Sequence, residues 1–225
     1  LKGLWFSSLG RNFSSLSVGI TIEKSERFMC SICYHLDSMS KHIIFIGLGN
    51  PGGKYRNTRH NIGYRVLDRL AQELNLEFRN KSSIQGELAE INLNAKSIML
   101  LKPTTFMNDS GKAVRSLLKQ TPLQKEEYSS AVFLIYDDLD LALGAWKVVI
   151  DSHPKQHNGV LSVIQEMGMS AFCHVRMGID SREGVRATPP EEYVLQPFSD
   201  QENQVVEQMI KEVVQELSKR IDQKG

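Results

Sequence analysis

The sequence predicts one α/β domain whose twisted, mostly parallel mixed sheet is flanked by helices in three layers, α/β/α. Short apolar runs rich in β-branched residues alternate with segments whose apolar residues recur at helical spacing, which is typical of this class. Hydrophobic residues make up 41% of the chain and charged residues 24%, as in ordinary globular proteins. The 225 residues are enough for one domain with a tail.

The elements can be assigned in order along the chain. Ile43–Gly47 is an apolar run that stops at glycines, as a buried strand does. Helical spacing begins near Asn61. In chain order we expect strand 43–47, a helix with Ile62, Val66, Leu67, Leu70 and Leu74 on one face, strands 87–93 and 97–101, helix 110–119, strands 132–136 and 144–150, helix 159–167 and strand 174–179.

The last predicted element is a long helix over residues 199–222. Pro189 and Pro190 break the chain before it, and Ser199 with Glu202 forms a capping-box pattern at its start. Apolar residues then recur on one face at Val206, Ile210, Val213, Leu217 and Ile221. The predicted domain therefore covers residues 42–225. No apolar stripe remains after this core is assigned, so we expect a monomer.

Residues 1–41 form a leader that we leave out of the domain and expect to be flexible. Residues 1–22 contain no acidic residue, and serines are interspersed with Leu, Phe and Trp, as in a mitochondrial transit peptide. A second interpretation carries equal weight: the chain opens on Leu1, and Met39 stands just before the first strand, so the leader could be a non-native extension. The first interpretation implies a mitochondrial location, and the second a cytoplasmic one.

Cysteine usage favours a reducing intracellular compartment. Cys30, Cys33 and Cys173 are too few for a disulfide framework. Cys30 and Cys33 do form a C-x-x-C pair, but a zinc site would need two more ligands at matching spacing, and only His35 lies near. We interpret the pair as incidental thiols.

The charge balance limits how nucleic acid could bind. The net charge is +1, so no global field attracts a polyanion, and any RNA contact must use a local basic patch. The longest apolar runs, such as Ala131 to Ile135, are too short to cross a bilayer. A soluble protein without a membrane partner is expected.

A glycine-rich turn follows the first strand. Gly47 to Gly52 fits G-x-G-x-x-G, the spacing of a dinucleotide-binding turn. A helix should start there so that its N-terminus meets the pyrophosphate. Instead, Gly53 to Arg59 is polar and lacks helical spacing. We therefore disfavour a nucleotide-dependent enzyme and interpret the turn as a loop that places Asn50 against a ligand.

Polar groups recur where predicted strands end or helices begin. They are His60, the run Phe106-Met107-Asn108, Asp137, and the pair His157-Asn158. In an α/β sheet, strand ends and helix starts can converge on one crevice. A histidine beside a carboxylate can act there as a general base on water, and asparagine amides can hold a peptide or stabilise an oxyanion. The sequence shows no serine elbow and no metal-ligand cluster, so direct attack of water on an ester is favoured.

Four motifs then make a family resemblance specific. They are GLGNPGGKYRNTRHNIG (Gly47–Gly63), KPTTFMNDSGKAV (Lys102–Val114), YDDLD (Tyr136–Asp140) and HNG (His157–Gly159). Their order and approximate spacing resemble those of the bacterial-type peptidyl-tRNA hydrolases, from about Ile43 to about Leu217, and we expect a eukaryotic member. The resemblance implies hydrolysis of the ester between peptide and tRNA, in translation and ribosome rescue, without cofactor or metal.

The resemblance also implies a role for each matching position. His60 matches the histidine that activates water, and Asp137 the aspartate that orients it. Asn50, grouped with these two as catalytic, and Asn108, with the backbone of Met107, match groups that hold the peptide and the ester. The remaining matches are Tyr55 packed beside the site, Asn158 with adjoining His157 at the tRNA acceptor end, and Lys147 and Arg176 as positions that receive tRNA phosphates.

Several alternatives stay open at this point. Asp138 is the main competitor of Asp137, and Asn108 and Asn158 resemble helix N-caps as well as ligand groups. The family's glycine-rich stretch before HNG is here Asp151 to Gln156, without glycine, and Lys155 could replace backbone contacts to tRNA with a charge. That departure supports a second hypothesis, a non-catalytic RNA-binding relative with a scaffolding role.

Overall fold

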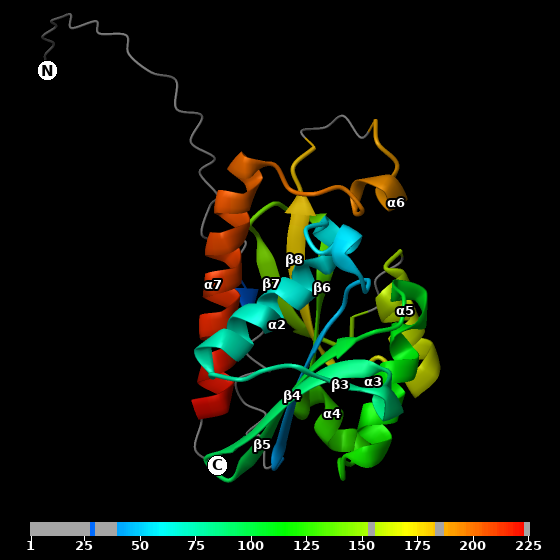
Figure 1. The fold of residues 1–225 in the computed structure, drawn as a ribbon, viewed down its shortest axis with the longest axis vertical. Coiled ribbons are helices and arrows are strands. Elements are labelled where there is room, and N and C mark those ends of the chain that lie inside the picture. Colours follow the sequence, from blue (N-terminus) through cyan, green and yellow to red (C-terminus); the bar gives the residue numbers. More distant parts are fainter. Residues whose placement is uncertain (1–27, 30–39, 153–155, 183–186, 223–225) are drawn as a thin grey trace, which may run out of the picture.

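A computed structural model of the chain describes residues 28–29, 40–152, 156–182 and 187–222. Within these ranges eight strands form one sheet in the order β1-β7-β8-β6-β2-β5-β4-β3. Helices cover both of its faces (Figure 1). The strands are β1 Phe28–Met29, β2 His42–Gly47, β3 Arg79–Lys81, β4 Gly86–Leu93, β5 Lys96–Pro103, β6 Val132–Ala142, β7 Trp146–Ile150 and β8 Cys173–Asp180.

The centre of the sheet is parallel. Strand β2 runs parallel to both β5 and β6, and β6 runs parallel to β8, whereas β3, β4 and β7 join antiparallel. The residues from Ile43 to Gly47 are all buried, because helices cover β2 on both sides. The predicted mostly parallel mixed sheet is confirmed.

Two sets of helices make the outer layers. The helices are α2 Ile62–Glu73, α3 Ser110–Gln120, α4 Tyr128–Ala131, α5 Asn158–Met167, α6 Pro190–Tyr193 and α7 Asp200–Asp222. One apolar core lies between the sheet and α2 with α7, and a second lies between the sheet and α3, α4 and α5. Figure 1 shows these two groups on opposite sides of the sheet. The three-layer prediction is confirmed.

Strand β6 differs from the prediction in a way that matters for the site. The prediction ended this strand at Tyr136 and placed Asp137 after it, but the strand continues to Ala142, so Asp137 lies inside it. Pairing with β8 is regular up to Asp138 and then shifts register before Ala142. The two aspartates can lie in a buried strand because each carboxylate has cationic or hydrogen-bonding partners.

Smaller elements escaped the sequence analysis. Arg79–Lys81 forms edge strand β3, and four residues form α4. Pro190, expected only to break the chain, begins α6, because a proline at the first helical position lacks only an N–H that would have no partner there. Phe28–Met29, within the predicted leader, form strand β1 and pair with β7. Cys30 and Cys33 lie outside the described residues, as do all other residues of 1–27 and 30–39, and the domain boundary stays a prediction.

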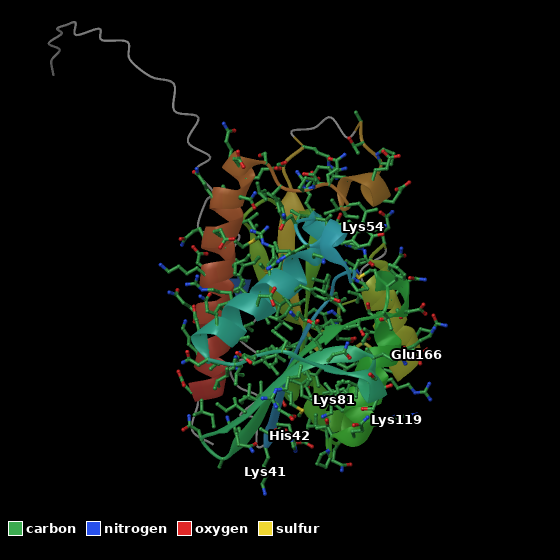
Figure 2. The ribbon with its side chains drawn as sticks, in the orientation of Figure 1. Lys41, His42, Lys54, Lys81, Lys119 and Glu166 are labelled. Carbon is green, nitrogen blue, oxygen red and sulfur yellow. The ribbon has the colours of Figure 1, made fainter. Side chains whose placement is uncertain are left out.

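The two ends of the sheet's central strands lie toward opposite ends of the molecule. Lys41 and His42, at the start of β2, lie at one end, and Lys54, which follows its carboxyl end, lies at the other (Figure 2). None of the helices in the described ranges has the length and hydropathy needed to cross a membrane. The starts of α2 and α5 meet the sheet at the end near Lys54, and the polar residues singled out above gather there.

Candidate active site

The centre of the site is a carboxylate shared by two histidines. Nδ1 of His60 lies 2.7 Å from Oδ1 of Asp137, and Nε2 of His157 lies 2.9 Å from the same oxygen. The two rings are 5.0 Å apart between centroids. His60 comes from the 3-10 turn Arg59–Asn61 before α2, His157 from the residue before α5, and Asp137 from β6. Three elements far apart in sequence thus converge on one oxygen atom.

Backbone geometry fixes the tautomer of His157. The N–H of Val160 donates to Nδ1 of His157 over 3.2 Å, so Nδ1 must carry a lone pair and the proton must lie on Nε2, which donates to Asp137. Both ring nitrogens of His157 are therefore engaged within the protein. His60 can in turn donate from Nδ1 to Asp137, which leaves its Nε2 unprotonated and available as a base.

The electrostatics of the pair favour a charged histidine. Burial opposes charge on both groups, but attraction to Asp137 and the hydrogen bond between them outweigh it and raise the pKa of His60 above its ordinary value of 6.5. Burial likewise opposes ionisation of Asp137, but attraction to His60 and His157 and their hydrogen bonds hold the pKa of Asp137 far below its usual range. Asp137 is thus an anion, ready to stabilise an imidazolium.

Asn50 is oriented by three hydrogen bonds. Its backbone N–H donates to Oδ1 of Asn61, and Nδ2 of Asn61 donates back to the backbone carbonyl of Asn50, each over 2.9 Å. The side-chain oxygen of Asn50 accepts from the backbone N–H of Met107 over 2.8 Å. The Nδ2 group of Asn50 donates to no residue in the described ranges and is the end of the amide that remains for a ligand.

Two glycines allow the elements of the site to approach. A Cβ on Gly63, in the first turn of α2, would lie 2.4 Å from the carbonyl oxygen of Ile135 and 2.6 Å from the nitrogen of Leu48. A Cβ on Gly159, in the first turn of α5, would lie 2.3 Å from the sulfur of Met107. Both motifs that carry a histidine therefore need glycine for close helix packing.

The remaining ligand candidates lie around this centre. Tyr55 sits in a 3-10 turn and makes an edge contact with Phe106, with ring centroids 6.5 Å apart. Met107 is buried, whereas Asn108 and Asn158 are exposed at the starts of their helices. The N-cap hypothesis for these two asparagines is wrong: the N-cap residues are Asp109 and His157, and Asn158 is the first residue of α5.

The two basic candidates are neighbours on the sheet. Lys147 of β7 and Arg176 of β8 pair across the antiparallel ladder, and Arg176 also pairs with Tyr136, the residue before Asp137. Arg176 makes an ion pair with Asp138. The competitor Asp138 thus faces Arg176, while Asp137 faces His60. Lys155, the third candidate, lies outside the described residues.

The histidine pair and Asp137 also have the composition of a metal site. Their ligand atoms all lie within 4.8 Å of one another, a grouping that the sequence analysis did not foresee because the three residues are far apart in the chain. Nδ1 of His60 and Nε2 of His157 already point at Asp137 over hydrogen-bond distances. A cation bound there would have to displace both of the bridging protons.

Two contributors to the site were missed from sequence. The side chain of Asn61 forms hydrogen bonds with the backbone of Asn50, and the carbonyl oxygen of Val194 accepts a hydrogen bond of 2.8 Å from the backbone N–H of His60. Asn61 follows His60 inside the first motif, so its position could have suggested a role. Val194 contributes only its carbonyl oxygen, which no sequence pattern reveals. The disfavoured dinucleotide hypothesis is also resolved, because Gly53–Tyr55 forms one 3-10 turn and α2 starts only at Ile62.

Comparison with solved structures places this fold among known ones. The structure is similar to a crystal structure of peptidyl-tRNA hydrolase in complex with N-propanol, with a TM-score of 0.72 and 25% identity over 81% of this chain and 90% of the other. It is also similar to the enzyme from Acinetobacter baumannii, with a TM-score of 0.70 and 24% identity over 82% of this chain and 94% of the other, a likeness that concerns the fold alone.

Sequence comparison covers the same region. The chain is 36% identical over 177 residues to the peptidyl-tRNA hydrolase of Prochlorococcus marinus strain MIT 9313, covering 77% of this chain and 84% of that protein. The enzyme of strain MIT 9303 is also 36% identical, over 76% of this chain and 82% of the other. The family model described as peptidyl-tRNA hydrolase matches residues 44–224. This chain therefore belongs to the peptidyl-tRNA hydrolase family.

Proposed function

We propose that this protein hydrolyses the ester bond that joins a peptide, or an N-blocked amino acid, to the 3′ end of tRNA. Family membership supports the substrate class. The observation that carries the chemistry is the contact of 2.7 Å between Nδ1 of His60 and Asp137, which leaves Nε2 of His60 as the base. Such a pair activates water at neutral pH.

In the proposed reaction, Nε2 of His60 takes a proton from a water molecule as that water attacks the ester carbonyl carbon. Asp137 stabilises the resulting imidazolium. The C–O bond to the 3′ oxygen of tRNA then breaks, and the imidazolium returns its proton to that oxygen. The products are a free peptide acid and tRNA with a 3′ hydroxyl group. This sequence of steps needs no covalent intermediate.

The proposed partners of this chemistry are amide and basic groups. Nδ2 of Asn50 is positioned to donate to the peptide or to the oxyanion, since Met107 holds the other end of the amide. Asn108 and Asn158, exposed at the two helix starts, are candidates for the peptide side and the acceptor end. Lys147, Arg176 and Lys155 are proposed to meet tRNA phosphates.

His157 acquires a role different from the one first considered. Its Nδ1 and Nε2 are both used within the protein, so we assign it to holding Asp137 and not to contacting substrate. With two donors on one oxygen, the Asp137 carboxylate has little freedom to rotate away from His60. His157 is then a positioning residue.

The direct test is release of peptide from N-blocked aminoacyl-tRNA by the wild type and by His60→Ala. We expect His60→Ala to lower kcat by roughly 10²–10⁴-fold, the usual contribution of a general base. Full activity in this variant would refute the mechanism. An inactive wild type that still bound tRNA would instead support the scaffold hypothesis.

A further inference from the structure

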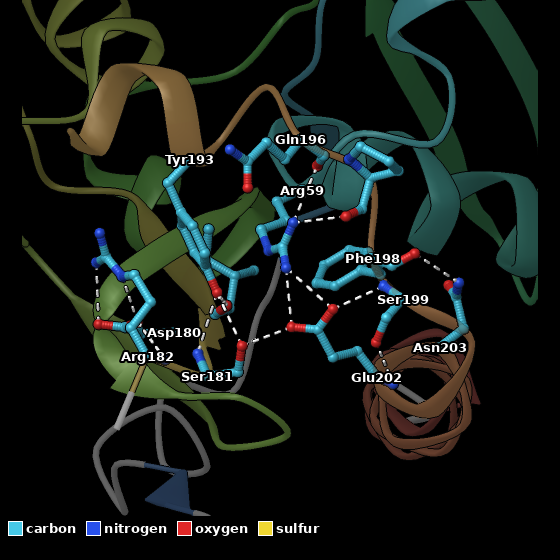
Figure 3. A network of polar contacts seen from close by, with 12 residues as sticks. Arg59, Asp180, Ser181, Arg182, Tyr193, Gln196, Phe198, Ser199, Glu202 and Asn203 are labelled. Atoms are coloured by element: carbon cyan, nitrogen blue, oxygen red, sulfur yellow. Dashed lines mark hydrogen bonds and ion pairs between the residues drawn. The ribbon is translucent and has the colours of Figure 1, made fainter. Parts of the chain in front are cut away.

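The residue before His60 is the hub of a buried polar network. The side chain of Arg59 is only 6% exposed. Its Nη2 donates to both carboxylate oxygens of Glu202, over 2.8 and 3.0 Å, and its Nη1 donates to the carbonyl oxygen of Pro197 over 2.6 Å. Figure 3 shows the guanidinium between the start of α7, which carries Glu202, and the chain around Gln196. Its Cζ atom lies 4.2 Å from the ring centroid of Tyr193 and 5.0 Å from that of Phe198.

This network secures the backbone that carries His60. The N–H of Arg59 donates to Gln196 over 3.0 Å, and the N–H of His60 donates to Val194 over 2.8 Å. Thr58 forms a bridge with Pro197. Residues 58–60 are therefore joined to segment 194–197 by backbone hydrogen bonds, as two short paired strands would be. Arg59 fixes that segment from the side by binding its carbonyl groups.

Glu202 connects the hub to two further elements. Its carboxylate accepts from the backbone N–H of Ser199 over 2.6 Å, which is half of the capping box predicted from sequence, and from Oγ of Ser181 over 2.5 Å. The donors from Arg59, Ser199 and Ser181 saturate the acceptor sites of this carboxylate. Ser181 follows β8, so Glu202 joins the end of β8, the start of α7 and the turn that carries His60 (Figure 3).

The ionic state of Glu202 fits this function. Partial burial opposes its ionisation, but the hydrogen bonds from Ser181 and Ser199 and the attraction of Arg59 outweigh it and lower the pKa of Glu202. The carboxylate therefore stays charged across the neutral range. Nη2 binds the carboxylate while Nη1 binds the carbonyl groups of Gln196 and Pro197, so the two nitrogens together fix the direction of the guanidinium.

We propose that Arg59 and Glu202 are positioning residues for His60: their ion pair holds segment 194–197 against residues 58–60 and thereby sets where the His60 imidazole meets the substrate. This inference deepens the proposed function and rests on it. His60 has two anchors, its ring on Asp137 and its backbone N–H on Val194. Arg59 and Glu202 act on the second anchor and touch no reacting atom.

The chain contains a matched control for this pair. Arg65, in α2, donates from Nη2 to Glu207 of α7 over 2.8 Å, so it joins the same two parts of the molecule. Glu207 is 63% exposed, however, and the pair contacts neither segment 194–197 nor His60 in the described residues. Glu207→Gln should therefore leave kcat unchanged, since an ion pair with an exposed carboxylate contributes little. Arg65→Lys, which keeps the charge beside Asn203, should do the same.

The experiment compares Arg59→Lys, Glu202→Gln and the double variant with these controls. Lysine keeps the charge but loses the planar group that binds Glu202 through one nitrogen and segment 194–197 through the other. Glutamine keeps the shape and the cap while losing the charge. Steady-state release from N-blocked aminoacyl-tRNA gives kcat and KM at a temperature below every measured Tm. NMR of ¹⁵N-labelled histidine follows the His60 ring through a pH titration in the absence of substrate.

We expect kcat to fall roughly ten- to a hundredfold in Arg59→Lys with KM unchanged, since displacement of a catalytic group by about 1 Å has effects of this size. The double variant should be no worse than the worse single variant, because both changes break one contact. The titration of His60 should move toward its ordinary value as the ring loosens on Asp137. Glu202→Gln, which keeps its cap, serves if Arg59→Lys does not fold.

Three results would overturn the inference: an unchanged kcat in both single variants despite a lower Tm, a rise in KM alone, or an equal loss of kcat in the Arg65 and Glu207 controls. A wild type without hydrolase activity would refute the proposed function instead. The His60 titration would still test the positioning, since an unmoved His60 signal in both variants contradicts it whatever the reaction is.

Discussion

The two walls of the site are built in different ways. The wall made by residues 47–61 is held by several hydrogen bonds: Asn50 is bound by Asn61 and Met107, His60 by Asp137 and Val194, and Arg59 by Glu202. The opposite wall combines His157, the N-cap of α5, with the preceding segment 151–156, of which only part is described. The first wall is thus fixed by many hydrogen bonds, whereas the second joins one fixed histidine to a segment that lacks glycine.

This difference separates chemistry from substrate handling. A general base must meet its water within tenths of an ångström, so the residues around His60 are bonded on several sides. Contacts to tRNA phosphates tolerate more variation, because electrostatic attraction depends weakly on exact position. Substitutions in the first wall should therefore change kcat, and those near the second should change KM or its salt dependence.

The largest effect is expected at the shared carboxylate. Asp137→Asn should lower kcat by as much as about 10⁴-fold, because an asparagine amide can donate to Nδ1 of His60 and force the tautomer that lacks a free Nε2. Single-turnover release of peptide would measure this. Asp138→Asn is the comparison, since Asp138 faces Arg176 and not His60. A greater loss in Asp138→Asn would reverse the assignment of the two aspartates.

The pH dependence tests the same pair. His60 must be unprotonated to act as a base, and its pKa is raised above 6.5 by Asp137. Activity should therefore be lost as the pH falls through this raised pKa and be regained above it. In Asp137→Asn the residual activity should persist to lower pH, because the charge that raised the pKa is gone. A profile of kcat/KM against pH that is the same for both proteins would contradict this electrostatic account.

The start of α5 should be sensitive to one methyl group. Gly159→Ala would place a Cβ 2.3 Å from the sulfur of Met107 and 3.2 Å from Cε1 of His157. We expect a loss of about 1–3 kcal/mol in the free energy of unfolding, typical of overpacking, with a fall in kcat. Denaturant unfolding measures the first. Gly53→Ala, where no atom lies within 4 Å of the new Cβ, should be nearly neutral.

Substitutions in the second wall should change the salt dependence of tRNA binding. Lys147→Gln should weaken tRNA binding modestly and reduce the slope of log affinity against log salt by about 1, the change expected for one lost phosphate contact. Binding titrations at several salt concentrations measure the slope. Lys41→Gln, at the end of the molecule away from Lys54 (Figure 2), should leave the slope unchanged. Equal slopes for all three proteins would remove Lys147 from the binding surface.

Much of the fold was predictable because its signals are local. The buried strand β2, the amphipathic faces of α2 and α7, and the capping box of Ser199 with Glu202 follow from spacing and residue type. The full length of β6 was not predictable, because its second half is stabilised by partners distant in sequence. Propensity disfavours aspartate in a strand, and only tertiary contacts to Asp137 and Asp138 reverse that preference.

The site was predictable to the level of its residues but not of its contacts. The structure pairs His60 with Asp137, and it binds Asn50 to Met107. That His157 shares the carboxylate, and that Val194 and Arg59 hold the backbone, depends on carbonyl groups and on packing between distant segments. Sequence patterns report side chains, so contacts made by the backbone escape them.

The smallest effect is expected at the start of the glycine-poor segment. Asp151 adopts a φ of 57°, which lies in the left-handed region that glycine favours. An aspartate thus stands at a position whose backbone conformation suits glycine. Its carboxylate accepts a hydrogen bond from Ser170. Asp151→Gly relieves the backbone strain but loses that bond and adds freedom to the unfolded chain, so the free energy of unfolding should change by less than about 1 kcal/mol. Asp151→Asn keeps an acceptor and tolerates the same φ, and it serves as the control.

If this segment governs access of the acceptor end of tRNA, Asp151→Gly will change KM for the tRNA substrate while kcat stays constant. A change in kcat alone would instead tie the segment to the first wall.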